Sequence, residues 1–203
     1  MTTFALIRHA SHGLLGHTMV GRAPGVPLSP DGVREAERLA ERLEDSGVGA
    51  LYSSPLERAR ATAAPIAARL RLQVQIADEL NEIDFGDWTN RTLTDLHDLE
   101  EWRRFNLFRS SSRIPNGEAM MDVQARMLRL IERLCSVHPD LTVALVSHGD
   151  VIKATLAHHL GVPLDLFQRI EISPASVSLV RIARYGPEVL LINGLAGDRL
   201  LQA

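Results

Sequence analysis

The stretch Phe4-Ala5-Leu6-Ile7-Arg8-His9-Ala10 decides how this chain folds and where its chemistry lies. Its first four residues form a short apolar run, which predicts a buried β-strand. Arg8 and His9 follow at the end of that strand, where open α/β sheets place their ligand-binding groups. Arginine offers a planar fork of donors for an oxyanion, and histidine offers a nucleophile or proton carrier near neutral pH. The stretch therefore predicts an α/β fold with a candidate site at this strand end.

Composition limits the class of protein. The 203 residues are 45% hydrophobic and 23% charged, which suits one good-sized core, so we expect a single domain over residues 1–203. The net charge of −3 provides no general basic field for nucleic acid or anionic membranes. The single cysteine, Cys135, allows no internal disulfide and suits a reducing compartment. With no signal-peptide pattern and no apolar stretch of membrane-spanning length, we expect a cytoplasmic protein without nucleic-acid or membrane partners. A homodimer stays open.

Strand-like and helix-like segments alternate along the chain. Apolar runs predict strands at residues 4–7, 50–53, 141–147, 177–182 and 189–192, with a short edge strand at 74–77. Helix signals begin at Ser29-Pro30 and Ser54-Pro55, and two more helices are expected over about 119–137 and 150–160. This order predicts a three-layer α/β/α sandwich with a mostly parallel central sheet. Residues 84–118 look like an excursion from the sheet, and we expect a cap over the site.

A second histidine follows a second buried strand. His148-Gly149 comes directly after the clearest apolar run, as His9 comes after the first. In a parallel sheet the two rings can face one another at the same edge, and the N-terminus of the following helix offers N–H donors to an anion. Either histidine alone is as readily a structural residue at a turn. Two of them at equivalent strand ends favour a functional site.

An arginine and an acid could complete this site. Arg58 lies in the first turn of a helix, where the helix dipole disfavours a cation, and this placement suggests a ligand role. Arg60 is expected to be a solvated surface residue. Glu82 lies between apolar neighbours that could raise its pKa and keep it protonated, with Asp84 and Asp87 as competing acids.

The histidines near the N-terminus raise the question of a metal site. His9, His12 and His17 lie close together in the sequence. No carboxylate or cysteine nearby completes a plausible set of ligands. We therefore expect neither a metal nor a cofactor at this strand end.

Four arginines, Arg103, Arg104, Arg109 and Arg113, lie among aromatic residues. Basic residues between aromatic ones can indicate nucleic-acid binding. Acidic residues directly precede them, however, so we expect an amphipathic cap helix with a solvated charged face. One of these arginines could contact the distal end of a substrate.

Together these motifs resemble those of the histidine phosphatase superfamily, the phosphoglycerate-mutase-like proteins. The matching segments are Leu6-Ile7-Arg8-His9, Gly21-Arg22 with Pro27-Leu28-Ser29 and Gly32, Ser53-Ser54-Pro55-Leu56 with Arg58, Ala59 and Thr62, Leu80 and Glu82-Ile83 with Gly86 and Trp88, and Val146-Ser147-His148-Gly149. They occur in the family's order and span nearly the whole chain. The resemblance implies a phosphoglycerate-mutase-like fold and a phosphoryl-transfer site.

The resemblance also implies a role for each residue of that site. His9 would be the nucleophile and form a phosphohistidine. Arg8, Arg58 and His148 would compensate the charge on the phosphoryl oxygens, as a metal ion does elsewhere. Glu82 would protonate the leaving oxygen and then activate the water that clears the phosphoenzyme.

The phosphate loop departs from the family's pattern. Ala10 stands where the family has glycine, and His12 and Leu15 stand where it often has a hydroxyl residue and an asparagine. Leu15 cannot donate a hydrogen bond to phosphate. Candidates to replace the missing donor are His12, His17 and Thr18, and Ser11 is a further one. With Gly149, Ser11 and His12 complete the expected substrate-binding residues.

The segment Glu82-Ile83-Asp84-Phe85-Gly86-Asp87-Trp88 has the compact form of the family's phosphatase branch. It therefore implies a histidine acid phosphatase-type hydrolase, metal-independent, acting on a small phosphate monoester through a phosphohistidine. Two alternatives stay open. One is a cofactor-dependent phosphoglycerate mutase-type phosphoryl transferase, and the other is a catalytically weak module that binds a phosphorylated ligand.

Overall fold

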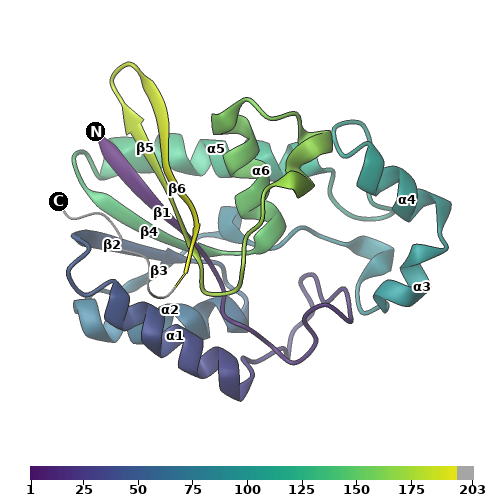
Figure 1. Ribbon diagram of the computed structural model, residues 1–203, viewed down its shortest axis with the longest axis horizontal. Coiled ribbons are helices and arrows are strands. Elements are labelled where there is room, and N and C mark those ends of the chain that lie inside the picture. The colour runs from purple at the N-terminus through teal and green to yellow at the C-terminus, as the bar shows by residue number, and fades with distance from the viewer. Residues whose placement is uncertain (196–203) are drawn as a thin grey trace.

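Six strands form one sheet in the computed structural model, which describes residues 1–195 (Figure 1). In order across the sheet they are β3 (Val74–Ile76), β2 (Val48–Ser53), β4 (Thr142–Ser147), β1 (Thr2–Arg8), β5 (Val177–Ala183) and β6 (Gly186–Gly194). β3, β2, β4 and β1 pair in parallel, and β5 and β6 add an antiparallel hairpin at the β1 side. The predicted mostly parallel sheet is confirmed, with the predicted short strand at one edge.

Helices cover both faces of this sheet (Figure 1). α1 (Pro30–Arg42) and α2 (Glu57–Leu70) pack on one face, and α5 (Met120–Val137) and α6 (Gly149–Leu160) pack on the other. The predicted three-layer α/β/α sandwich is therefore confirmed. Within residues 1–195, none of the helices combines the length and the apolar character needed to cross a bilayer.

The apolar run of β1 is buried on both of its faces. Phe4 and Leu6 pack in the core under α5 and α6, whereas Ala5 and Ile7 pack in the core under α1 and α2. A strand between two helical layers needs apolar residues at every position, which is why its sequence reads as a continuous run. This burial fixes the direction in which Arg8 leaves the sheet.

The start of α1 anchors the loop that follows β1. The Ser29 hydroxyl caps the helix by accepting a hydrogen bond from Gly32 N (3.0 Å), and Pro30 occupies the first helical position. Ser29 N donates to Ser11 O (3.0 Å), and a Cβ added at Gly32 would lie 1.9 Å from that oxygen. Glycine is required at this position because the loop backbone lies directly against the helix.

The last strand begins earlier than the predicted range of 189–192. β6 begins at Gly186, and Pro187 is already paired with Ile182 inside the ladder. A proline is tolerated there because β6 is the outer strand, where an N–H facing away from the sheet has no partner to lose.

The excursion between residues 84 and 118 contains several short helices rather than one amphipathic helix. A 3₁₀ turn (Gly86–Trp88) is followed by α3 (Leu93–His97) and α4 (Glu100–Leu107). Two other 3₁₀ segments, Asp78–Leu80 and Leu164–Arg169, lie before and after it in the chain.

The prediction that the arginines of this excursion lie on a solvated face is wrong for one of them. Arg103, Arg104 and Arg113 are exposed, but Arg109 is only 2% exposed. Its guanidinium lies 4.5 Å from the ring centroids of both Phe105 and Phe167. Stacking against two aromatic faces offsets part of the cost of removing the cation from water.

Candidate active site

Two histidines meet at the carboxyl edge of the sheet. β1 and β4 are parallel neighbours with Arg8 opposite Ser147, so His9 and His148 leave the sheet side by side. His9 N donates to Ser147 O (2.9 Å), and the two ring centroids lie 5.1 Å apart. Both side chains are buried, and the arrangement expected from the two strand ends is observed.

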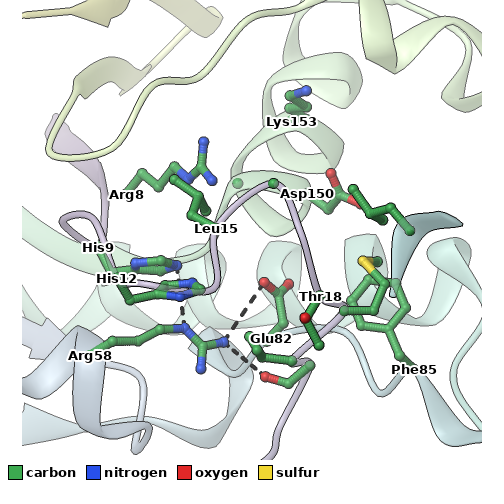
Figure 2. Close-up of a pocket in the computed structure, with 16 residues that line it drawn as sticks. Arg8, His9, His12, Leu15, Thr18, Arg58, Glu82, Phe85, Asp150 and Lys153 are labelled. Atoms are coloured by element: carbon green, nitrogen blue, oxygen red, sulfur yellow. Dashed lines mark hydrogen bonds and ion pairs between the residues drawn. The ribbon is translucent and has the colours of Figure 1, made fainter. Parts of the chain in front are cut away.

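Arg58, in the first turn of α2, connects the two rings. Its Nε donates to His9 Nε2 (3.3 Å) and its Nη2 lies 3.3 Å from His148 Nδ1. Nη2 also donates to Gly21 O (2.8 Å) in the loop after β1 (Figure 2). Arg58 is 1% exposed, so its guanidinium is buried between the histidines although the helix dipole disfavours a cation at this position.

The partners of the two rings indicate which nitrogens carry protons. His9 Nδ1 lies 2.8 Å from Ala10 O and donates to it, which leaves a lone pair on Nε2 facing Arg58. His148 accepts from Arg58 at Nδ1 and donates from Nε2 to the Ser54 hydroxyl (2.9 Å). Burial, and then the charge of Arg58, lowers the pKa of His9 well below its usual value. Burial, and then His9, lowers the pKa of His148 in the same way, so both rings are neutral.

Glu82 brings an acid to the same place. Its Oε2 lies 3.6 Å from His148 Nδ1 and 4.0 Å from Arg58 Nη2, and its Oε1 accepts from Ile83 N (3.0 Å). Burial raises the pKa of Glu82 to about 7, and the opposing effect of Arg58 is smaller. A carboxyl group that titrates near neutrality can both give and accept a proton.

The two competing acids are directed elsewhere. Asp84 lies 3.8 Å from the guanidinium of Arg22, and both carboxylate oxygens of Asp87 accept from Asn116 Nδ2 (3.1 and 3.0 Å). Neither lines the pocket that contains Glu82.

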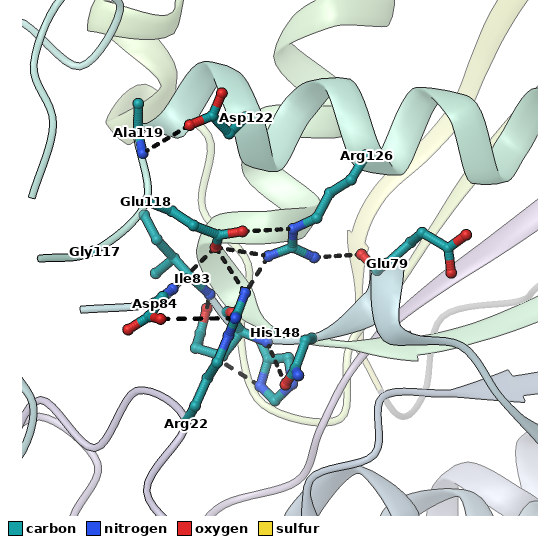
Figure 3. Close-up of polar contacts among 12 residues, drawn as sticks. Arg22, Glu79, Ile83, Asp84, Gly117, Glu118, Ala119, Asp122, Arg126 and His148 are labelled. Carbon is teal, nitrogen blue, oxygen red and sulfur yellow. Dashed lines mark hydrogen bonds and ion pairs between the residues drawn. The ribbon is translucent and has the colours of Figure 1, made fainter. Parts of the chain in front are cut away.

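A network of charged side chains, shown around Arg22, Glu118 and Arg126 in Figure 3, holds the backbone of Glu82. The carbonyl oxygen of Glu82 accepts from Arg22 Nε (2.7 Å) and from Arg126 Nη2 (3.3 Å). Glu118 joins the two arginines, because its Oε2 accepts from Arg22 Nη2 (2.8 Å) and from Arg126 Nη2 (3.3 Å). Arg126 also donates to the carbonyl oxygen of Glu79. Three distant segments therefore fix the position of the acid, and no motif or spacing in the sequence indicated Glu118 or Arg126.

Arg8 reaches across the start of α6. Its Nη1 donates to Ile172 O (2.6 Å), while its buried Nε has no hydrogen-bond partner among residues 1–195. The guanidinium lies so close to Gly149 that an added Cβ would be 3.3 Å from Arg8 Nε. Together with the N–H groups at the start of α6, Arg8 provides donors that suit an anion.

His12 lines the pocket beside His9, with 5.4 Å between ring centroids. Leu14 N donates to His12 Nδ1 (3.3 Å), so the neutral ring carries its proton on Nε2. Burial, and then the charges of Arg58 and Arg8, lowers the pKa of His12 to about 4. His12 thus offers a neutral N–H donor in the loop where Leu15 cannot donate.

The structure does not bring Ser11 into the pocket. Its N–H and its hydroxyl both donate to the Glu35 carboxylate of α1, at 2.8 and 2.9 Å. The neighbouring Ala10 is fully buried, and its N–H donates to the Thr62 hydroxyl (2.9 Å), which donates in turn to Arg58 O (2.8 Å). Thr62 lies one helical turn after Arg58, and this i+4 spacing is the signal that could have shown its role.

The pocket has a polar inner end and a mixed outer wall (Figure 2). It is lined by Arg8, His9, His12, Leu15, Gly16, Thr18, Met19, Val20, Gly21, Arg58, Glu82, Phe85, Leu93, Gly149, Asp150 and Lys153. Asp150 and Lys153, on the first turns of α6, had no predicted role. Among residues 1–195, no three His, Cys, Asp or Glu side chains group in a way that could hold a metal ion, and this includes the N-terminal histidines.

Comparison with known proteins agrees with this geometry. A protein named as a probable phosphoglycerate mutase, from Proteus mirabilis, is 33% identical over 76% of this chain and 73% of its own length. Phosphoserine phosphatase 1 of Hydrogenobacter thermophilus is 30% identical over 95% of this chain and 92% of its own. The solved alpha-ribazole phosphatase of Shigella flexneri superposes with a TM-score of 0.84 at 28% identity, over 99% of this chain and 98% of the other. The sequence profile of the histidine phosphatase superfamily (branch 1) matches residues 4–194. The chain therefore belongs to the histidine phosphatase superfamily.

Proposed function

We propose that this protein hydrolyses small phosphate monoesters through a phosphorylated His9. The observation that carries the proposal is a neutral, pocket-lining histidine whose Nε2 lone pair faces the Arg58 guanidinium, with a carboxyl group of pKa about 7 close by. Relatives named as phosphatases support hydrolysis.

In the first step, His9 Nε2 attacks phosphorus, and the bond between phosphorus and the ester oxygen breaks. A neutral imidazole is required because a protonated ring has no lone pair for this attack. The departing alkoxide takes the proton of Glu82, whose raised pKa keeps a large fraction protonated near pH 7.

In the second step, water attacks the phosphohistidine. The Glu82 carboxylate left by the first step takes a proton from that water, the bond from phosphorus to Nε2 breaks, and inorganic phosphate leaves. One carboxyl group thereby serves as acid and then as base.

The phosphoryl group would lie among donors of fixed position. Arg8 Nε and Arg58 supply positive charge, and the N–H of Gly149 at the start of α6 adds a backbone donor. His12 would supply the donor that the loop otherwise lacks. Residues 84–118 would act as a cap, since Phe85 and Leu93 of this segment line the pocket.

Release of inorganic phosphate tests the proposal. The panel of esters would include 3-phosphoglycerate and phosphoserine, with EDTA present, and the chain would be compared with its His9→Ala and His17→Ala variants. His17 is exposed in the same loop and does not line the pocket, so it is the matched control. We expect release by the wild type and by His17→Ala, and none by His9→Ala.

Two outcomes would overturn hydrolysis. Interconversion of phosphoglycerates without phosphate release would indicate a mutase. Binding of esters with no turnover of any of them would indicate a binding module.

A further inference from the structure

Two charged residues of the pocket, Asp150 and Lys153, have no part in the proposed reaction. Asp150, the second residue of α6, lines the outer wall, with 23% of its side chain exposed (Figure 2). A carboxylate is an unexpected lining for a pocket that binds phosphate, because like charges repel. Its presence calls for a positive or donating partner.

Arg109 holds Asp150 from behind. Arg109 Nη1 lies 3.6 Å from Asp150 Oδ2, and Arg109 Nη2 donates to Asn106 Oδ1 (2.7 Å). The guanidinium is 2% exposed and stacked between the rings of Phe105 and Phe167, so it cannot turn into the pocket. A rigid buried cation behind a carboxylate orients it.

The position of Asp150 along the chain could also be explained by the helix dipole, since an acid in the first turn of a helix is favourable. That role needs no pocket-facing placement and no buried arginine behind the carboxylate. Both features are observed, and they point to a ligand group on the other side.

We propose, resting on the proposed phosphatase function, that Asp150 binds a hydrogen-bond donor on the alcohol part of the substrate. The preferred substrates are then phosphate esters of amino alcohols or polyols, and esters of hydroxy acids without such a donor are disfavoured. Asp150 lines the same pocket as Glu82, which protonates the leaving oxygen in the proposed reaction, and lies near enough for its charge to act on that carboxyl group, which favours a place on the leaving-group side.

Lys153, one turn further along α6, is the competing residue. It also lines the pocket, and its Nζ donates to Gln168 Oε1 (3.1 Å). If Lys153 rather than Asp150 selected the substrate, esters carrying a carboxylate would be preferred. Selection by Asp150 and selection by Lys153 therefore predict opposite orders of preference among esters with donating and with carboxylate groups.

Four esters of matched size separate them: phosphoethanolamine, 2-hydroxyethyl phosphate, ethyl phosphate and phosphoglycolate. We expect kcat/KM to fall in that order, by about tenfold or more from phosphoethanolamine to ethyl phosphate, because a hydrogen bond between charged groups is strong. Asp150→Asn removes the charge but keeps an acceptor oxygen, so it should reduce this ratio several-fold. The comparison uses ratios because the charge of Asp150 also contributes to raising the pKa of Glu82, which affects all four esters.

The control is Asp98→Asn, which removes an exposed carboxylate outside the pocket and should leave both the rates and their order unchanged. Asp150→Asn keeps the size and shape of the side chain, and the melting temperature reports whether the variant folds. If it does not fold, the order measured on the wild type still decides. Phosphoglycolate as the best substrate, or a ratio unaffected by Asp150→Asn, would overturn the inference. Failure of all esters would instead overturn the phosphatase function.

Discussion

Replacing Glu82 by Gln should stabilise the fold at high pH and not at low pH. Burial raises the pKa of this carboxyl group from 4.5 to about 7. The folded state therefore resists ionisation, whereas the unfolded state ionises freely above pH 4.5. Between these two values the contribution of Glu82 to the stability of the wild type falls as pH rises, and above about pH 7 the loss is complete. A shift of this size corresponds to about 3 kcal/mol.

Gln resembles the protonated acid and cannot ionise. Its side-chain oxygen can still accept the hydrogen bond from Ile83 N that Glu82 Oε1 accepts. The variant should therefore match the wild type near pH 4.5 and exceed it by up to about 3 kcal/mol near pH 8. The same change should lower phosphate release by about a hundredfold or more, because the acid and base are lost.

Urea unfolding at the two pH values measures both free energies of unfolding. Glu100→Gln is the control, because Glu100 is an exposed acid at the start of α4, and it should change stability little at either pH. The reasoning is refuted if the difference between Glu82→Gln and the wild type is the same at both pH values. It is equally refuted if the variant is the less stable protein near pH 8.

Gly32→Ala should destabilise the fold by about 2 kcal/mol, because the added Cβ would lie 1.9 Å from Ser11 O, and an unchanged urea midpoint would contradict this. Glu118→Gln should lower kcat about tenfold with little change in KM, since the network holds Glu82 rather than the substrate, and a change in KM alone would count against that role. In the Glu82→Gln variant, where this acid no longer titrates, the fold should lose stability as pH falls below 6.5, because the two buried histidines stay neutral when folded but take up protons when unfolded. Equal melting temperatures at pH 7 and pH 5 would contradict it.

The layers and the central site were predictable because both depend on local sequence features. Continuous apolar runs mark strands buried on two faces, and a polar residue directly after such a run lies at the sheet edge. His9 and His148 therefore had to emerge together once β1 and β4 were neighbours. The sequence does not say that these two strands are neighbours, and the resemblance to a family supplied that step.

Contacts between distant segments were not predictable in this way. Arg22, Glu118 and Arg126 lie on three segments that share no periodicity. They meet only because Arg22 and Arg126 donate to the carbonyl oxygen of Glu82, and Glu118 accepts from the next-but-one backbone N–H, that of Asp84. Arg109 has the composition of a solvated residue, and only its position between two rings shows otherwise. In both cases the residue type indicates the charge of the side chain, but only tertiary packing decides which groups that charge contacts and whether it is exposed to water.

Binding of a phosphate dianion should itself prepare the acid for the proposed reaction. Arg58 favours ionisation of Glu82, although burial outweighs it. An anion beside Arg58 offsets that charge, and its own negative charge acts directly on the carboxyl group, so both effects raise the pKa of Glu82 further. Glu82 is then protonated in the complex at neutral pH, when the leaving oxygen needs a proton. Loss of that proton with the alcohol leaves a carboxylate with a raised pKa, which is the base that the second step requires.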